Sequence, residues 1–106
     1  MPGKIAVALT TAPTVEKAAE IARILVGEGL AACVNVVPAV RSIYAWKGEI
    51  VDEAEALCVV KTRADRVEAL RARLVALHPY EVPELVVLDV AGGHEPYLSW
   101  VEASVR

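Results

Sequence analysis

The chain has 106 residues, of which 56% are hydrophobic and 24% are charged, and its formal net charge is −3 at pH 7. Its length suits one compact domain over residues 1–106, and its apolar content excludes an intrinsically disordered protein. Because lysine and arginine are dispersed along an acidic chain, and no uncharged stretch approaches the ~20 apolar residues of a membrane-spanning helix, we expect neither nucleic acid nor a membrane as a partner.

The N-terminus and the cysteines bear on location. Strand-like sequence begins at Lys4 without the apolar region and cleavage site of a secretory signal, so we expect a cytoplasmic protein. Cys33 and Cys58 lie in apolar surroundings without C-x-x-C spacing, and the simplest expectation is two reduced, buried thiols. The chain also has more apolar residues than so small a domain easily buries, which favours an oligomer.

The first predicted elements are a strand over residues 4–9 and a helix. The segment Thr10-Thr11-Ala12-Pro13-Thr14 supplies turn and N-cap chemistry before apolar residues that recur at helical spacing. We expect this helix to end near Gly27 or Gly29.

A bent strand, a turn and an unusually long third strand are predicted for residues 30–61. Pro38 interrupts the β-like sequence at a position that only a bulge, an edge or a strand end tolerates, and Lys47-Gly48 makes a plausible turn. In the third strand, residues 56–60 are apolar on both faces and should be covered. The acidic residues before them should form a solvated face; they are Glu49, Asp52, Glu53 and Glu55.

A second helix, a connector, a last strand and a final helix complete the order. The segment from Thr62 to Asp65 has the pattern of a capping box, with a hydroxyl at its first position and a carboxylate at its last. An apolar face then marks a helix that ends at or before His78. Residues 85–88 are predicted to form a buried strand and residues 95–105 a final helix.

The predicted order is β-α-β-β-α-β followed by a C-terminal helix. It is the order of the ferredoxin-like α+β fold, in which two helices cover one face of a four-stranded antiparallel sheet. The other sheet face would then be uncovered. Its simplest cover is another copy of the same chain.

The connector between the second helix and the last strand carries the chain's densest polar chemistry: His78-Pro79-Tyr80-Glu81-Val82-Pro83-Glu84. One hypothesis is a divalent metal site formed by Cys33, His78 and Glu81, because thiolate, imidazole and carboxylate together suit Cu(II) or Zn(II). A second is a structural connector whose polar groups bond internally, with the His78 imidazole at the negative end of the preceding helix. A third is a small-molecule site.

A lysine and several aromatic residues are further candidates for ligand contacts. Lys61, at the end of the long strand, can pair with Glu81 or Glu84 or hold an anionic ligand, and the ion pair is the simpler expectation. Aromatic side chains are expected in the core or an interface more often than stacked on a ligand. These residues are Trp46, Tyr80, Tyr97 and Trp100.

Five segments give the chain a family resemblance. They are Ala31-Ala32-Cys33-Val34-Asn35, Ser42-x-Tyr44-x-Trp46-x-Gly48, Lys61-Thr62, His78-Pro79-Tyr80-Glu81-x-Pro83-Glu84 and Tyr97-Leu98-x-Trp100. With these segments in this order and spacing, the sequence resembles the CutA divalent-cation tolerance family over nearly its whole length.

The resemblance implies a homotrimer of ferredoxin-like subunits, similar in architecture to PII signalling proteins, whose long hairpins pair across subunit boundaries. It implies no enzymatic reaction. We therefore expect a non-enzymatic protein that binds Cu(II) or another divalent metal ion. The alternative is a PII-like sensor that holds a small effector in an intersubunit cleft. The cleft would include His78 and Glu81, and the candidate effector contacts are Lys61, Tyr80, Trp46 and Tyr97.

Overall fold

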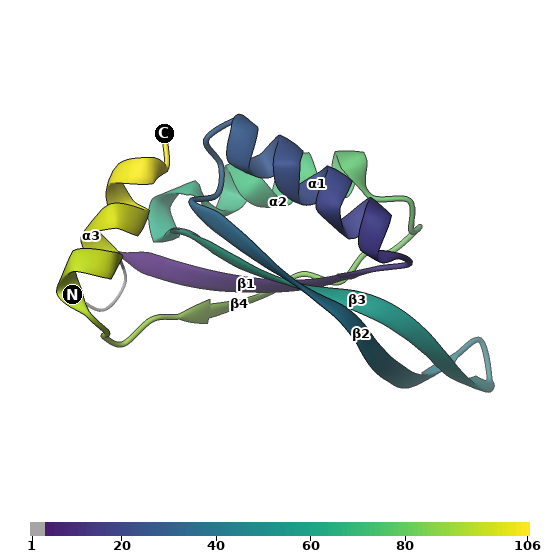
Figure 1. Ribbon diagram of the computed structural model, residues 1–106. Coiled ribbons are helices and arrows are strands. Elements are labelled where there is room, and N and C mark those ends of the chain that lie inside the picture. The colour runs from purple at the N-terminus through teal and green to yellow at the C-terminus, as the bar shows by residue number, and fades with distance from the viewer. Residues whose placement is uncertain (1–3) are drawn as a thin grey trace.

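The computed structural model describes residues 4–106, which form one four-stranded sheet, three α-helices and a short 3₁₀ helix (Figure 1). In chain order the elements are β1 (Ile5–Ala12), α1 (Val15–Gly27), β2 (Cys33–Trp46), β3 (Glu49–Arg63), the 3₁₀ helix (Ala64–Arg66), α2 (Val67–Leu77), β4 (Val86–Asp89) and α3 (Glu95–Ser104). Within this part of the chain, no helix has the length and apolar character needed to span a membrane.

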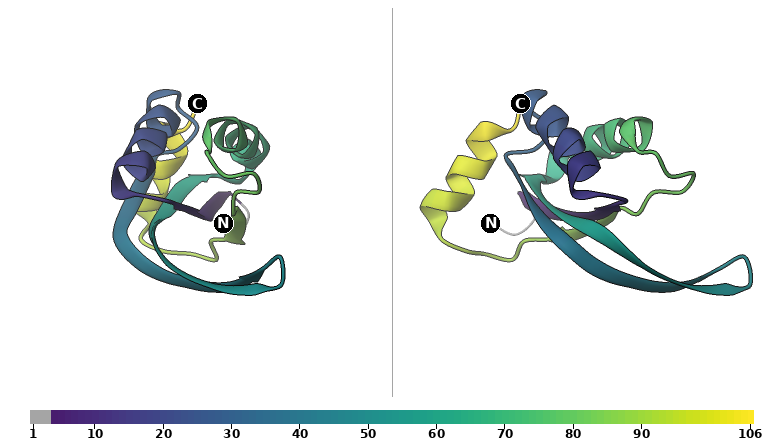
Figure 2. Two further views of the ribbon diagram at one scale, coloured as in Figure 1. Left: turned by 90° about the vertical axis from the view of Figure 1, so that its right-hand side faces the viewer. Right: turned by 45° about the vertical axis from the view of Figure 1, so that its right-hand side comes forward.

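The sheet has the strand order β2-β3-β1-β4, and all three neighbouring pairs are antiparallel. Helices α1 and α2 lie over one face, and α3 lies beside the end where β1 begins (Figure 1). The predicted ferredoxin-like α+β architecture is therefore confirmed. The last β1–β3 pair is Ala12 with Ala56, so the β2–β3 hairpin continues past the end of β1 and projects from the sheet (Figure 2).

The core lies between the sheet and the two helices. Leu25 on α1 and Leu70 and Leu74 on α2 are each 1% exposed, and they belong to one buried cluster with strand residues such as Ala8 and Ala56. Small residues on the strands allow the helices to approach closely, and burying each leucine contributes roughly 1.5–3 kcal/mol. The prediction that residues 56–60 of β3 are covered on both faces is confirmed for one face only: Ala56, Cys58 and Val60 belong to this core, whereas Leu57 and Val59 alternate with them and are only partly buried.

The sheet face opposite the helices is apolar and accessible in the single chain. Strand β4 forms the edge beside β1, and Val86 and Leu88 are 48% and 49% exposed. The prediction that residues 85–88 form a buried strand is therefore wrong for one chain. The apolar run was correctly assigned to a strand, but edge position and an uncovered face leave its side chains accessible.

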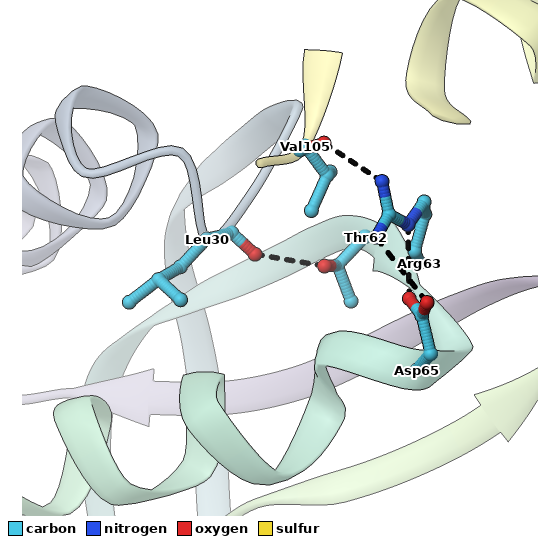
Figure 3. A network of polar contacts seen from close by, with 5 residues as sticks. All are labelled: Leu30, Thr62, Arg63, Asp65 and Val105. Carbon is cyan, nitrogen blue, oxygen red and sulfur yellow. Dashed lines mark hydrogen bonds and ion pairs between the residues drawn. The ribbon is translucent and has the colours of Figure 1, made fainter. Parts of the chain in front are cut away.

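The helix cap at Thr14 is confirmed, because its hydroxyl accepts a hydrogen bond from the Lys17 N–H at 3.0 Å. The predicted capping box at Thr62 is wrong. Thr62 lies inside β3, and its hydroxyl donates to the Leu30 carbonyl at 2.7 Å (Figure 3). Asp65 instead accepts from Arg63, whose guanidinium also donates to the Val105 carbonyl at 2.9 Å. The Thr62 hydroxyl thus links β3 to the segment that follows α1.

The long hairpin has the predicted irregularity and turn. The register between β2 and β3 shifts between Val37 and Val40, where Pro38 lacks the N–H that a regular ladder needs. At the tip, Lys47 and Gly48 have φ values of 51° and 83°. Two positive φ values in a two-residue loop are typical of the type I′ turn that matches the twist of a hairpin.

Candidate functional site: a groove between hairpin and connector

The connector of residues 78–85 joins α2 to β4 and begins where a proline ends the helix. Pro79 disfavours helical geometry at the preceding residue, and His78 is accordingly extended, with φ −78° and ψ 138°. The chain then passes the end of β1 and approaches the part of β3 that has no β1 partner. The connector's side chains can therefore reach the projecting hairpin.

His78 fastens the start of the connector to β1. Its imidazole is buried, and Nε2 lies 2.7 Å from the Thr11 carbonyl oxygen. Because a carbonyl only accepts, Nε2 carries the proton, and the unprotonated Nδ1 accepts from the Tyr80 N–H at 3.1 Å. Both ring nitrogens are thus used within the chain. The partner is the β1 carbonyl rather than the C-terminus of α2.

Tyr80 connects the connector to β3. Its hydroxyl donates to Glu55 at 2.5 Å, and Glu55 is only 7% exposed. Burial first, and then the hydrogen bond to the Glu55 carboxylate, raise the pKa of Tyr80 above its usual value. The prediction that Glu55 belongs to a solvated face is therefore wrong. Glu55 is the first β3 residue beyond the end of β1, where its carboxylate accepts the Tyr80 hydrogen bond.

A groove of about 740 Å³ lies between the hairpin and the connector. Glu53 and Glu55 line it from β3, while Glu81 and Glu84 line it from the connector. Three aromatic side chains contribute to the same groove; they are Tyr44, Trp46 and Tyr80. Its volume lies within the ~300–1,000 Å³ that small-molecule pockets usually have. The groove therefore combines the size of a ligand site with an acidic and aromatic lining.

The proposed metal ligands do not converge within one chain. Cys33 lies opposite Lys61 on β3, whereas His78 contacts Thr11, which lies opposite Leu57. Four residues of strand separate these two β3 positions, a distance of about 13 Å. Among residues 4–106, no three His, Cys, Asp or Glu side chains are grouped so that they could hold a metal ion.

The structure also places the residues predicted for the effector cleft in separate parts of the fold. Trp46, Tyr80 and Glu81 line the groove. Lys61 instead contacts the Asn35 side chain, so the expected ion pair with Glu81 or Glu84 is wrong for this chain. Tyr97 packs on α3 against Trp100, with ring centroids 5.7 Å apart.

The two cysteines differ in their surroundings. Cys58 is 2% exposed, and burial raises the pKa of its thiol, which confirms the expected buried cysteine. Cys33 is only half-buried, and its thiol lies 3.9 Å from the Asn35 side-chain oxygen. Cys33 is therefore less buried than Cys58, and the prediction that both cysteines are buried is wrong for Cys33.

A family model described as CutA1 divalent ion tolerance protein matches residues 6–104. The chain belongs to the CutA1 family. The "Divalent-cation tolerance protein CutA" of Thermus thermophilus is 50% identical over 95 residues, which are 90% of this chain and 92% of that protein. The mouse "Protein CutA" is 46% identical over 95% of this chain. The chain spans only 57% of the mouse protein's length.

Solved structures agree with the family assignment. The Thermus thermophilus Cut A1 structure has a TM-score of 0.93 and 47% identity, covering 96% of this chain and 99% of that chain. A Nostoc structure named as a PII-like protein CutA has a TM-score of 0.89 and 41% identity, covering 95% and 97% of the two chains. This CutA1-family chain therefore has the PII-like form of the ferredoxin-like fold.

Sequence reasoning did not assign the two β3 glutamates to the groove's lining. Glu53 accepts a hydrogen bond from the Tyr44 hydroxyl at 2.7 Å, and Glu55 has Tyr80 as its partner. Glu53 and Glu55 are two residues apart on a strand, a spacing that places both on one face and provided the available signal. The partner of Glu55 lies 25 residues away in the sequence, so no local pattern could pair them.

Proposed function

We propose that this CutA1-family chain acts without catalysing a reaction, as a cytoplasmic homotrimer that binds Cu(II) or another divalent cation in the response to metal ions. The observation that carries the proposal is the family match over residues 6–104. The apolar sheet face at β4 supports self-association, because exposed Val86 and Leu88 would gain burial against a second copy.

Metal binding would then depend on the subunit boundary. His78 uses both ring nitrogens inside its own chain, and the three candidate ligands are not grouped there. Cys33 is a half-buried residue of β2 in register with Lys61 and Val7. Because their strand neighbours Val60 and Ala8 belong to the core, these residues lie on the sheet face opposite the helices. We therefore propose Cys33 as the soft donor and expect the remaining donors to come partly from a neighbouring subunit.

Calorimetric titration of Cu(II) into protein that has been reduced and then freed of reductant tests this proposal, with light scattering to give the oligomer mass. Cys33→Ala should lose the high-affinity phase, whereas Cys58→Ala, which changes a thiol that is 2% exposed, should keep it. Equal affinity and stoichiometry in the wild type and in Cys33→Ala would remove Cys33 from the site. A mass equal to one chain of 11.3 kDa would contradict the homotrimer.

The second candidate function is that of a PII-like sensor for a small effector. The groove of about 740 Å³ favours it, because Trp46, Tyr80 and Glu81 from the predicted cleft all line this space. A small ligand that shields the Trp46 and Tyr80 side chains from solvent would support the sensor function. A groove filled by another subunit's side chains would count against it.

A further inference from the structure

The charge of the groove restricts the ligands that it can take. Within the described residues 4–106, every charged side chain that lines the groove is a glutamate. Two of them, Glu53 and Glu55, belong to the β3 wall, and Glu81 and Glu84 belong to the connector wall. An anionic ligand would meet like charge from both walls, whereas a cationic ligand would be attracted by both.

Two of these carboxylates are held in place by phenols. Tyr44 donates to one oxygen of Glu53 at 2.7 Å, and Tyr80 donates to one oxygen of Glu55 at 2.5 Å. Each carboxylate can still accept hydrogen bonds through its other oxygen. The donated bonds also restrict the side-chain rotamers, so a ligand that binds here orders less of the protein than it would on a mobile acidic surface.

Aromatic side chains in the groove suit an organic cation. In the single chain, Trp46 and Tyr44 are 46% and 40% exposed and both line the groove, so a ligand there would contact their rings. The ammonium of Lys47 already lies 5.9 Å from the centroid of the Trp46 ring, within the range of a cation–π interaction. Apolar surface beside the charges can also pack against methylene groups, which a hydrated metal ion lacks.

The distribution of the carboxylates favours an extended cation over a compact one. No three acidic side chains within residues 4–106 come close enough together to hold one metal ion, although four line the groove. Along β3, Glu53 and Glu55 are two residues apart, about 7 Å of strand. Charges arranged along a groove match a ligand whose positive groups are separated by methylene chains.

We propose that the groove between the β2–β3 hairpin and the connector binds a small organic polycation of the aliphatic polyamine class. The inference rests on the sensor alternative for the proposed function and names its ligand class. Its ammonium groups would pair with glutamates of both walls, and its methylene chain would lie against Trp46 and Tyr44. A bound polycation would link the hairpin to the connector, so binding would change the surroundings of the hairpin's side chains.

The test uses spermidine as the probe, titrated into the full chain in the presence of a metal chelator. In a Trp100→Phe background, Trp46 is the one remaining tryptophan of the sequence and reports on the groove by fluorescence. We expect saturable binding with a change in Trp46 emission. Removing two charges with Glu81→Gln and Glu84→Gln should weaken the affinity about tenfold.

Glu16→Gln with Glu20→Gln is the matched control, because it removes the same charge from the exposed surface of α1. Its affinity should equal that of the wild type. Absence of saturable binding would overturn the proposal, as would an equal loss in both double variants or, in a separate titration without chelator, displacement of spermidine by an equal concentration of magnesium. Light scattering and Cu(II) titration of the same preparation report separately on the homotrimer and on metal binding, so these can fail without spermidine binding failing.

Discussion

The two ends of the β2–β3 hairpin are built from the same strands but are stabilised differently. At the base, Ala56, Cys58 and Val60 of β3 are at most 2% exposed and lie against the helices. At the tip, Ile43 and Ile50 are 63% and 75% exposed. The base lies beneath α1 and α2, whereas the tip stands beyond the end of β1 (Figure 1).

The difference shows where the chain's own stability resides. The base gains from hydrophobic burial, which contributes roughly 25 cal/mol per Å² of apolar surface. The tip has cross-strand contacts such as Arg41 with Asp52 at 2.8 Å and Tyr44 with Glu53 at 2.7 Å, and polar pairs at exposed positions contribute little because water screens them. The tip's apolar side chains are consequently available for a ligand or another chain.

The largest expected effect comes from damaging the core above the hairpin's base. Leu74→Ala should reduce the free energy of unfolding by about 2–5 kcal/mol, because a side chain that is 1% exposed leaves a cavity. Urea unfolding at one fixed chain concentration measures it. The adjacent Val75 is 46% exposed, and Val75→Ala should change the same quantity by no more than about 0.5 kcal/mol. Similar losses in both variants would contradict the contrast between the covered and uncovered regions.

An intermediate effect is expected at the joint between the two regions. Tyr80→Phe removes the hydroxyl that donates to buried Glu55 and should cost about 1–3 kcal/mol at neutral pH. Urea unfolding again gives the free energy. Tyr44→Phe is the matched control, because its partner Glu53 is exposed and the carboxylate can bond to water instead. A larger loss of unfolding free energy in Tyr44→Phe than in Tyr80→Phe would contradict the prediction that the Tyr80–Glu55 hydrogen bond is the more stabilising of the two.

The same phenol predicts a loss of stability in alkali. Burial and the Glu55 carboxylate raise the pKa of Tyr80 in the folded chain above its value of about 10 in the unfolded chain. Above that pH the unfolded chain releases the phenol proton first, so the contribution is complete below about pH 10 and is lost as the pH rises further. The free energy of unfolding should therefore fall less steeply above about pH 10 in Tyr80→Phe than in the wild type. Equal slopes would contradict the Tyr80–Glu55 bond.

Several elements of the fold could be predicted from sequence because their signals are local. Apolar residues at strand and helix spacing, the Thr14 cap and the Lys47-Gly48 turn each depend on a few neighbouring residues, and all four features are present. The errors arose where the partner is distant. Thr62 fits a local capping pattern, but the hydroxyl bonds to Leu30, 32 residues earlier, because β3 continues through this position.

The groove was predictable only in part for the same reason. The connector's polar composition indicated Tyr80 and Glu81 as candidate ligand contacts, and the aromatic spacing near the turn indicated Trp46. Strand register then decided the rest, because it places Cys33 opposite Lys61 and away from His78. Residue types alone do not give the register of strand pairing. They could therefore not show whether Cys33, His78 and Glu81 lie close together.

The smallest effect is expected at the tip, where backbone conformation can be separated from packing. Gly48 has a φ of 83°, and a Cβ added to it would meet nothing within 4 Å. Gly48→Ala should therefore cost about 1 kcal/mol of unfolding free energy through the left-handed backbone alone. Gly27→Ala is the control, because Gly27 ends α1 in equally open space without a left-handed φ. That change should stabilise the chain by up to about 1 kcal/mol, since alanine loses less backbone entropy on folding. Changes of opposite sign in the unfolding free energy of the two variants, measured by urea unfolding, would show that the left-handed turn orders the tip. A loss in Gly48→Ala as large as that in Leu74→Ala would instead show that the tip is packed as tightly as the base.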